Sequence, residues 1–281
     1  MALTELNAKI YIYNTITVAS MITEKVLEGM FKPVQSPWKT SITKVEPNKL
    51  TTRGHKQEDL IGGISFSEMV YLLVKGDIPS EKNKKMLEAI LVSFCDHGVT
   101  PPSTQSARLM ASAGSPVNAC IAGGILAFGE NHAGAIENTM KNLQEAIKVS
   151  EIYNRSSYEA AKFIVEDYKK KGKKIPGFGH RYHTEDPRAR KLIELAKHYD
   201  CNGKHYELAI EIEKILAKKN GIKMNIDGAN AAILSDLGFN WRFGCGMFII
   251  GRIPGLLAHV NEEMSNEEPF RKIIQNTGFP I

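Results

Sequence analysis

Apolar residues recur at spacings of three and four along most of this chain, which is the period of an amphipathic α-helix. In the stretch 65–74, for example, Phe66, Met69, Val70 and Leu73 fall on one stripe. The same spacing predicts helices over 80–94, 133–147, 158–170, 187–199, 206–219 and 229–237. Strand patterns are short and weak, as at 42–45. The chain is therefore predicted to be all-α.

Two longer apolar stretches, 117–128 and 243–260, could be membrane spans or core helices. The first is too short to span a bilayer, and the second has Arg252 and Pro254 in its middle. We therefore expect both to be buried helices and expect no membrane association. A guanidinium inside an apolar helix must be paired with an anion. For Arg252, a structural ion pair and a bound substrate carboxylate fit equally well.

Composition narrows the function classes only slightly. The 36 basic and 31 acidic residues of this 281-residue chain give a mild net charge of +5. With no aromatic ladder and no zinc pattern, this charge does not favour a nucleic-acid partner. The four cysteines form no CxxC pair, and the N-terminus lacks a signal-peptide pattern. We expect reduced thiols, a cytoplasmic location and no metal centre.

The densest polar segment is "IPGFGHRYHTEDPRARK", residues 175–191, which joins a glycine turn, His180 and an arginine-bearing helix start. A turn or a helix cap alone would not need so many hydrogen-bond donors, so the segment predicts a pocket for an anion. Three other positions are ambiguous when taken singly. His132 could be a cap or core residue, Asp227 an Asx-turn, and the lysines of 169–174 a helix C-terminus or a phosphate site.

Taken together, six motifs follow an order that resembles the citrate synthase superfamily along nearly the whole chain. They are "TTRGHKQEDLIGGISFSEMVYLLVKGDIPS" (51–80), "DHG" (96–98), "ENHAGA" (130–135), "PGFGHRYHTEDPRA" (176–189), "NIDGAN" (225–230) and "IIGRIPGLLAHVNEE" (249–263). The resemblance implies an all-α, citrate synthase-like two-domain fold, shortened relative to full-length synthases. Residues 1–133 and 239–281 would form the large domain, and 134–238 a small mobile domain.

The chain departs from the synthases in two places. Only about one helix, 81–95, separates "GDIPS" from "DHG", where the synthases have a long helical insert, and Gly98 replaces their acidic residue. Both features look like those of citryl-CoA lyases and of the C-terminal module of ATP-citrate lyase. The resemblance therefore implies cleavage of citryl-CoA to acetyl-CoA and oxaloacetate, a step of the reductive tricarboxylic acid cycle.

The resemblance also implies roles for individual residues. His180 would handle the proton of the substrate hydroxyl, His132 would donate to the thioester oxygen, and Asp227 would exchange the proton at the acetyl carbon. The oxaloacetate part would be bound by His97, Arg188, Arg252 and, from a neighbouring subunit, Arg271. Coenzyme A would be bound by Pro176, Gly177, Phe178, Gly179, Arg181, Lys173 and Lys174.

No permanently bound cofactor is implied, because the coenzyme A thioester is itself the substrate. The resemblance implies a homo-oligomer built on dimers, with a citryl-CoA synthetase as functional partner. Two other functions remain open. The chain could be a short citrate or 2-methylcitrate synthase, since the catalytic residue types are the same. It could also be an acyl-CoA-binding subunit of a larger citrate-cleaving complex.

Overall fold

The computed structural model describes residues 23–25, 29, 38–180 and 184–271, and the chain divides into two compact units, Met1–Gly54 and His55–Ile281. In the first unit, β1 (Thr43–Glu46) and β2 (Lys49–Thr52) pair antiparallel. Asn48 takes a positive φ of 55° in the tight turn between them, a conformation that Asn tolerates. The strand expected at 42–45 is confirmed, shifted by one residue.

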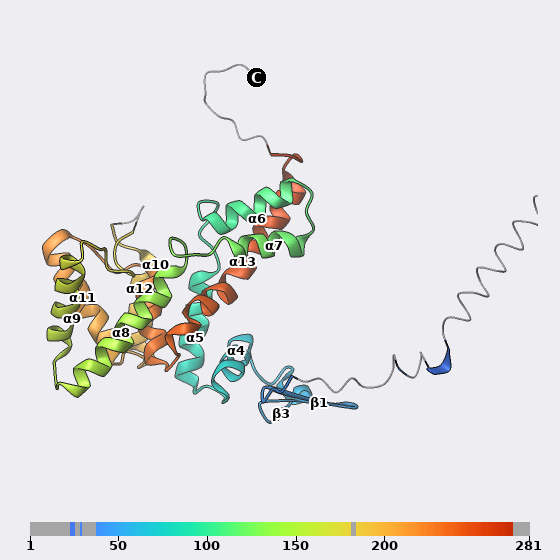
Figure 1. Cartoon of the computed structure of the whole chain (residues 1–281), viewed down its shortest axis with the longest axis horizontal. Helices are drawn as coiled ribbons and strands as arrows, with labels where there is room; N and C mark the ends of the chain where they lie inside the picture. The colour runs from blue at the N-terminus through green and yellow to red at the C-terminus, as the bar shows by residue number, and fades with distance from the viewer. Residues whose placement is uncertain (1–22, 26–28, 30–37, 181–183, 272–281) are drawn as a thin grey trace, which may run out of the picture. The chain divides into compact units, whose positions relative to one another are not determined.

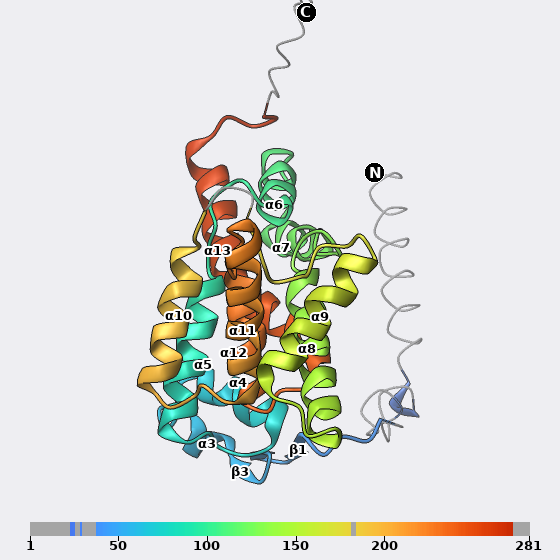
Figure 2. The ribbon, with the colours of Figure 1, turned by 90° about the vertical axis from the view of Figure 1, so that its left-hand side faces the viewer.

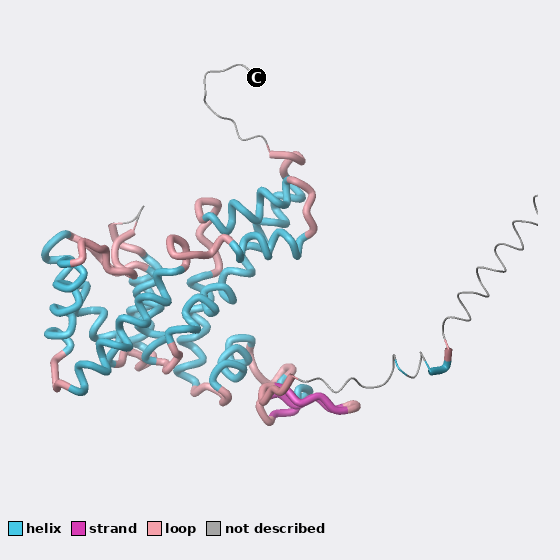
Figure 3. The backbone as a smooth tube through the Cα atoms, in the orientation of Figure 1, coloured by secondary structure: helices cyan, strands magenta, loops and turns pink. Residues whose placement is uncertain are grey.

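The second unit begins with β3 (His55–Lys56), and the rest of its described secondary structure is helical (Figures 1 and 3). Its helices are α3 (Gln57–Leu60), α4 (Phe66–Lys75), α5 (Glu81–Phe94), α6 (Pro102–Ser112), α7 (Val117–Leu126), α8 (Gly134–Ile152), α9 (Ser157–Lys170), α10 (Pro187–His198), α11 (Lys204–Asn220), α12 (Ile226–Asp236), the short 3₁₀ helix η1 (Trp241–Phe243) and α13 (Gly244–Asn266). The predicted all-α fold class is confirmed.

Local signals explain why several helices begin and end where they do. Ser65 and Glu68 form a capping box at the start of α4, and Gly76 ends this helix with a left-handed φ of 96°. Ser80 accepts the Asn83 N–H at the start of α5. These positions match the predicted stripes at 65–74 and 80–94, so pattern and capping agree.

Helix α12 is the centre of the larger core. Nine of its 11 residues are buried, and it packs against α8, α10 and α11, which run beside it (Figure 2). A helix that is buried on nearly all sides needs neighbours around its whole circumference. Its first turn is therefore held rigidly, and that turn carries Asp227. The proposed boundaries of a mobile domain at 133/134 and 238/239 stay a prediction.

A smaller core lies where α6 and α7 pack against α13 (Figure 1), and it contains Ala107, Cys120 and Leu256. The stretches 117–128 and 243–260, which were expected to be buried helices, are helical but only partly buried. Leu126 is 83% exposed, and only 39% of the apolar window in the helical stretch Trp241–Asn266 is buried, although that stretch is long and apolar enough to cross a membrane. Each helix buries one face in the core and leaves an apolar face uncovered.

Two glycines let the turn at 177–179 lie directly against the start of α12. A Cβ on Gly228 would overlap the carbonyl oxygen of Gly177, whose own φ is 83°. The Asn225 N–H donates to that carbonyl at 3.0 Å, and the Gly179 N–H donates to the carbonyl of Lys223 at 2.7 Å. The motifs "PGFGH" and "NIDGAN", which are distant in sequence, are joined here by backbone hydrogen bonds.

This close approach makes Gly228 a sensitive position. We expect Gly228→Ala to lower the free energy of unfolding by about 1–3 kcal/mol, the usual cost of overpacking. Denaturant titration would measure the change. Gly246→Ala is the matched control, because nothing lies within 4 Å of a Cβ there and alanine favours helix by up to about 1 kcal/mol. Equal stability of the two variants would contradict this account of the junction.

Candidate active site

One cavity of about 250 Å³ brings together half of the site residues singled out in the sequence. They come from the loop after α5, the turn before α8, the loop before α10, the first turns of α10 and α12 and the middle of α13. The predicted site residues that line it are His97, His132, Gly179, His180, Arg188, Asp227 and Arg252.

Asp227 lies in the first turn of α12 and is partly exposed to the cavity. Its Oδ1 atom is buried and has no hydrogen-bond partner. Burial raises the pKa of this carboxyl to about 6, against the opposing effects of Arg188 and Arg252 and with a contribution from Asp186. An acid with this pKa can hold or release a proton near neutral pH.

His132 is fixed by a residue that the sequence analysis missed. Its Nε2 atom lies 2.8 Å from the hydroxyl of Ser103, which is fully buried in the first turn of α6. Its backbone closes a tight turn by exchanging two hydrogen bonds with Gly129, at 2.8 and 3.0 Å. Ala133, with a φ of 69°, then leads directly into α8. The histidine therefore stands before a helix N-terminus, as its position in "ENHAGA" suggested.

The other two histidines face each other across the cavity. The rings of His97 and His180 meet edge to face, with centroids 5.8 Å apart. Burial lowers the pKa of His97, and the nearby charge of Arg188 lowers it further. His97 is therefore neutral at physiological pH and can offer both a donor and an acceptor.

Asp186 is a second residue that the sequence analysis did not single out. Its carboxylate is 1% exposed, caps α10, and binds the Arg188 guanidinium through contacts of 3.1 and 3.0 Å. It also accepts the Ile226 N–H at 3.1 Å. Burial acts to raise the pKa of Asp186, but these hydrogen bonds and the charge of Arg188 hold it below its usual value. Asp186 thus stays ionised and orients Arg188.

Arg252 is the least satisfied charge in the cavity. The residue is 3% exposed, and its Nε atom donates to the Phe94 carbonyl at 2.7 Å. The guanidinium lies 4.9 Å from the centre of the Phe248 ring, and its Nη1 atom is buried without a hydrogen-bond partner. Among the described residues no carboxylate lies within ion-pair distance of Arg252, so the structural ion pair considered above is not formed. A cation left in this condition favours binding of an anion from outside.

The remaining predicted site residues do not line this cavity. Arg271 instead pairs with Glu263 through contacts of 2.7 and 2.6 Å. Lys173 and Lys174 are exposed in the loop after α9, and Pro176, Gly177 and Phe178 are not part of the cavity lining. Arg181 lies outside the described residues. In the described part of the chain, no group of three or more metal-ligating side chains is placed to hold a metal.

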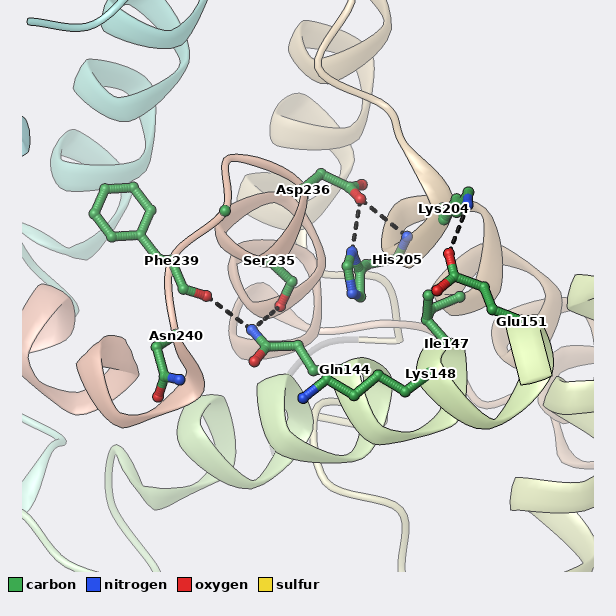
Figure 4. A pocket seen from close by; sticks show the side chains of 11 residues that line it. Gln144, Ile147, Lys148, Glu151, Lys204, His205, Ser235, Asp236, Phe239 and Asn240 are labelled. Atoms are coloured by element: carbon green, nitrogen blue, oxygen red, sulfur yellow. Dashed lines mark hydrogen bonds and ion pairs between the residues drawn. The ribbon is translucent and has the colours of Figure 1, made fainter. Parts of the chain in front are cut away.

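A larger hollow of about 450 Å³ lies elsewhere, between α8, the end of α12 and the start of α11 (Figure 4). Its most prominent polar group, Asp236, already accepts the N–H groups of His205 and Tyr206 and contacts the His205 ring at 2.8 Å. Asp236 therefore acts as a cap for α11, supplied by another helix. None of the predicted site residues lines this hollow.

Comparisons with known proteins identify the family of the chain. Residues 80–275 match the family model described as "Citrate synthase, C-terminal domain". The chain is 32% identical to citrate synthase 2 of Bacillus subtilis over 76% of its own length, but it spans only 56% of that relative. The chain belongs to the citrate synthase family. The resemblance inferred from the six motifs is thereby confirmed.

Two solved structures are similar to this chain. The structure of citryl-CoA lyase from Hydrogenobacter thermophilus is 41% identical and has a TM-score of 0.77. The match covers 87% of this chain and 96% of that one. ATP citrate lyase from Methanothrix soehngenii has a TM-score of 0.72 over 96% of this chain and 48% of its own, but at 19% identity it supports the fold alone.

The raised pKa of Asp227 predicts a specific pH dependence of stability. Because the pKa is about 6 in the folded chain and 3.8 ordinarily, the folded state binds this proton more tightly than the unfolded state. The stability from this proton is complete below about pH 4 and is lost as the pH rises through about 6. Asparagine cannot ionise, so Asp227→Asn does not lose this stability as the pH rises. At pH 7 the variant should therefore be more stable than the parent by up to about 3 kcal/mol.

Urea titrations of both proteins at intervals from pH 4 to pH 7.5 would measure this difference. The control is Asp59→Asn, which changes an exposed carboxylate and should follow the parent at every pH. A constant offset between Asp227→Asn and the parent would contradict the raised pKa.

Proposed function

We propose that this protein is a citryl-CoA lyase, which cleaves citryl-CoA to acetyl-CoA and oxaloacetate. The observation that carries the proposal is the cavity itself. A buried acid with a raised pKa, two facing histidines and an unpaired guanidinium surround one small space. The similarity to citryl-CoA lyase over nearly the full length of both chains supports the choice of reaction.

The cleavage needs a base, a hydrogen-bond donor and an acid, and the cavity offers one residue for each. In our proposal His180 takes the proton of the tertiary hydroxyl as the carbon–carbon bond breaks and the oxaloacetate ketone forms. The bonding electrons move into the thioester, and His132 donates a hydrogen bond to its oxygen. Asp227, protonated at the start, then gives its proton to the carbon and leaves acetyl-CoA.

The observed surroundings of His132 and Asp227 support the roles proposed for them. The hydroxyl of Ser103 orients the His132 ring. The desolvated Asp227 favours its protonated form, which the cleavage direction requires. Arg188 and Arg252 would bind the two carboxylates of the oxaloacetate part, with His97 as a neutral hydrogen-bond donor.

The coenzyme A part would lie over the turn at 176–179, whose glycines allow a ligand to approach the backbone closely. Lys173 and Lys174 are exposed near this turn and remain available to phosphate groups. The assignment of Arg181 stays a prediction, because it lies outside the described residues. Arg271 would bind the oxaloacetate part only in an oligomer, where one subunit contributes this residue to the site of its neighbour.

A homo-oligomer built on dimers is part of the proposal. The uncovered apolar faces of α7 and α13, with Leu126 and Leu257 exposed, support it. A cytoplasmic location and a citryl-CoA synthetase as functional partner also remain proposals. The second candidate function is a short citrate synthase, favoured by the 32% identity to citrate synthase 2 and by the same catalytic residue types.

Products of citryl-CoA distinguish the candidates. We expect the purified protein to release oxaloacetate from citryl-CoA without free thiol, since a lyase leaves the thioester intact. Thiol release from acetyl-CoA plus oxaloacetate would instead establish the synthase. Activity in neither assay would favour the acyl-CoA-binding subunit.

Asp227→Asn should reduce turnover by at least about 100-fold, as expected for loss of a general acid, while coenzyme A binding is retained.

Arg252 gives a second test of the proposed site. We expect Arg252→Leu to weaken oxaloacetate binding by about 10-fold or more, because a charge-assisted contact is lost. Calorimetric titration would measure it. Arg190→Leu, which changes an exposed arginine of α10, should bind as the parent does. Unchanged affinity in Arg252→Leu would contradict its role as carboxylate ligand.

A further inference from the structure

Helix α13 holds the end of α5 and the loop after it through three successive contacts. Arg252 donates to the Phe94 carbonyl at 2.7 Å. One turn later Gly255 approaches so closely that a Cβ there would overlap the Cys95 carbonyl oxygen. One turn further, the Nε2 atom of His259 lies 2.9 Å from Oδ1 of Asp96. Consecutive residues of the loop are thus fixed by consecutive turns of one helix.

Asp96 passes this restraint to the next residue. Burial acts to raise the pKa of its carboxylate, but the hydrogen bond with His259 and the nearby backbone N–H groups of Gly98 and His97 hold that pKa below its usual value. Gly98 takes a φ of 65°, which lets the chain turn sharply here. The carboxylate therefore fixes the backbone that carries His97 into the cavity.

The contacts of His259 fix which of its nitrogens donates. A carboxylate only accepts hydrogen bonds, so Nε2 must donate to Asp96. The Nδ1 atom then accepts from Nη1 of Arg108, 3.4 Å away. Arg108 is in turn held by Glu262 and by the buried Glu263. The imidazole is 15% exposed, does not line the cavity, and is held on both sides.

We propose that His259 is a positioning residue that sets the place of His97, and through it the affinity of the cavity for the oxaloacetate part of the substrate. The role of His97 as a ligand rests on the proposed function, whereas the dependence of its ring position on His259 does not. His259 touches no reacting atom, so its loss acts on substrate binding more than on turnover.

Three variants separate positioning from a general structural role. His259→Leu loses the hydrogen bond to Asp96, and His259→Gln keeps a donor that can reach it. Asn261→Ala changes an exposed residue of the same helix and serves as the control. We expect His259→Leu to raise KM for citryl-CoA by about 10-fold, the effect of losing a hydrogen bond to a charged group, with kcat within about threefold. His259→Gln should restore most of the affinity.

A second measurement is independent of activity. Long-range 1H–15N spectra of protein labelled with 15N-histidine report each imidazole, and the His97 signals are identified by their loss in His97→Gln. We expect His259→Leu to shift the His97 signals in the ligand-free protein, and His259→Gln and Asn261→Ala to leave them near their parent positions.

The outcomes divide cleanly. Unmoved His97 signals in His259→Leu would overturn the proposal, whatever the protein catalyses. The proposal would also be overturned if His259→Gln raised KM for citryl-CoA as much as His259→Leu does while keeping the melting temperature of the parent. If His259→Leu shifts the His97 signals but the parent protein neither binds oxaloacetate nor cleaves citryl-CoA, the positioning role is supported and the proposed function is rejected.

Discussion

The geometry of the cavity depends on one buried carboxylate, that of Asp186. It caps α10, binds Arg188 at two atoms and accepts the first N–H of α12. The first turns of α10 and α12 are thereby joined through one side chain, and Arg188 lines the cavity beside them. Without this carboxylate the N-terminus of α12 would lose a hydrogen-bond acceptor and Arg188 its counter-ion. Both losses are costly inside a protein.

Two aspartates at the cavity illustrate how surroundings decide the protonation state of a side chain. Asp186 has a guanidinium and backbone donors and stays ionised, whereas Asp227 has an unpartnered oxygen and a raised pKa. Their proximity reinforces the difference, because the negative charge of Asp186 opposes ionisation of Asp227. One aspartate is suited to hold structure and the other to move a proton.

The sequence pattern predicted the helices whose buried faces are apolar, and the motifs predicted which polar side chains would converge. Helix α6 was missed, because its buried face includes Ser103, Thr104 and Arg108 and shows no apolar stripe. Ser103 carried no signal of its own. Asp186 did carry a sequence signal, because an acidic residue directly before a proline is a common start of a helix. No sequence pattern shows that Arg271 pairs with Glu263 in its own chain, because that contact is set by how α13 ends.

The unpaired guanidinium of Arg252 has a consequence for the lifetime of the protein. A folded chain that leaves a buried charge unsatisfied is less stable than it would be with its anion bound, and only the folded state can bind that anion. A ligand at 100 times its dissociation constant adds about 2.7 kcal/mol to folding stability. Because proteases in a cell degrade transiently unfolded molecules, the supply of that anion would then affect how much of this protein persists.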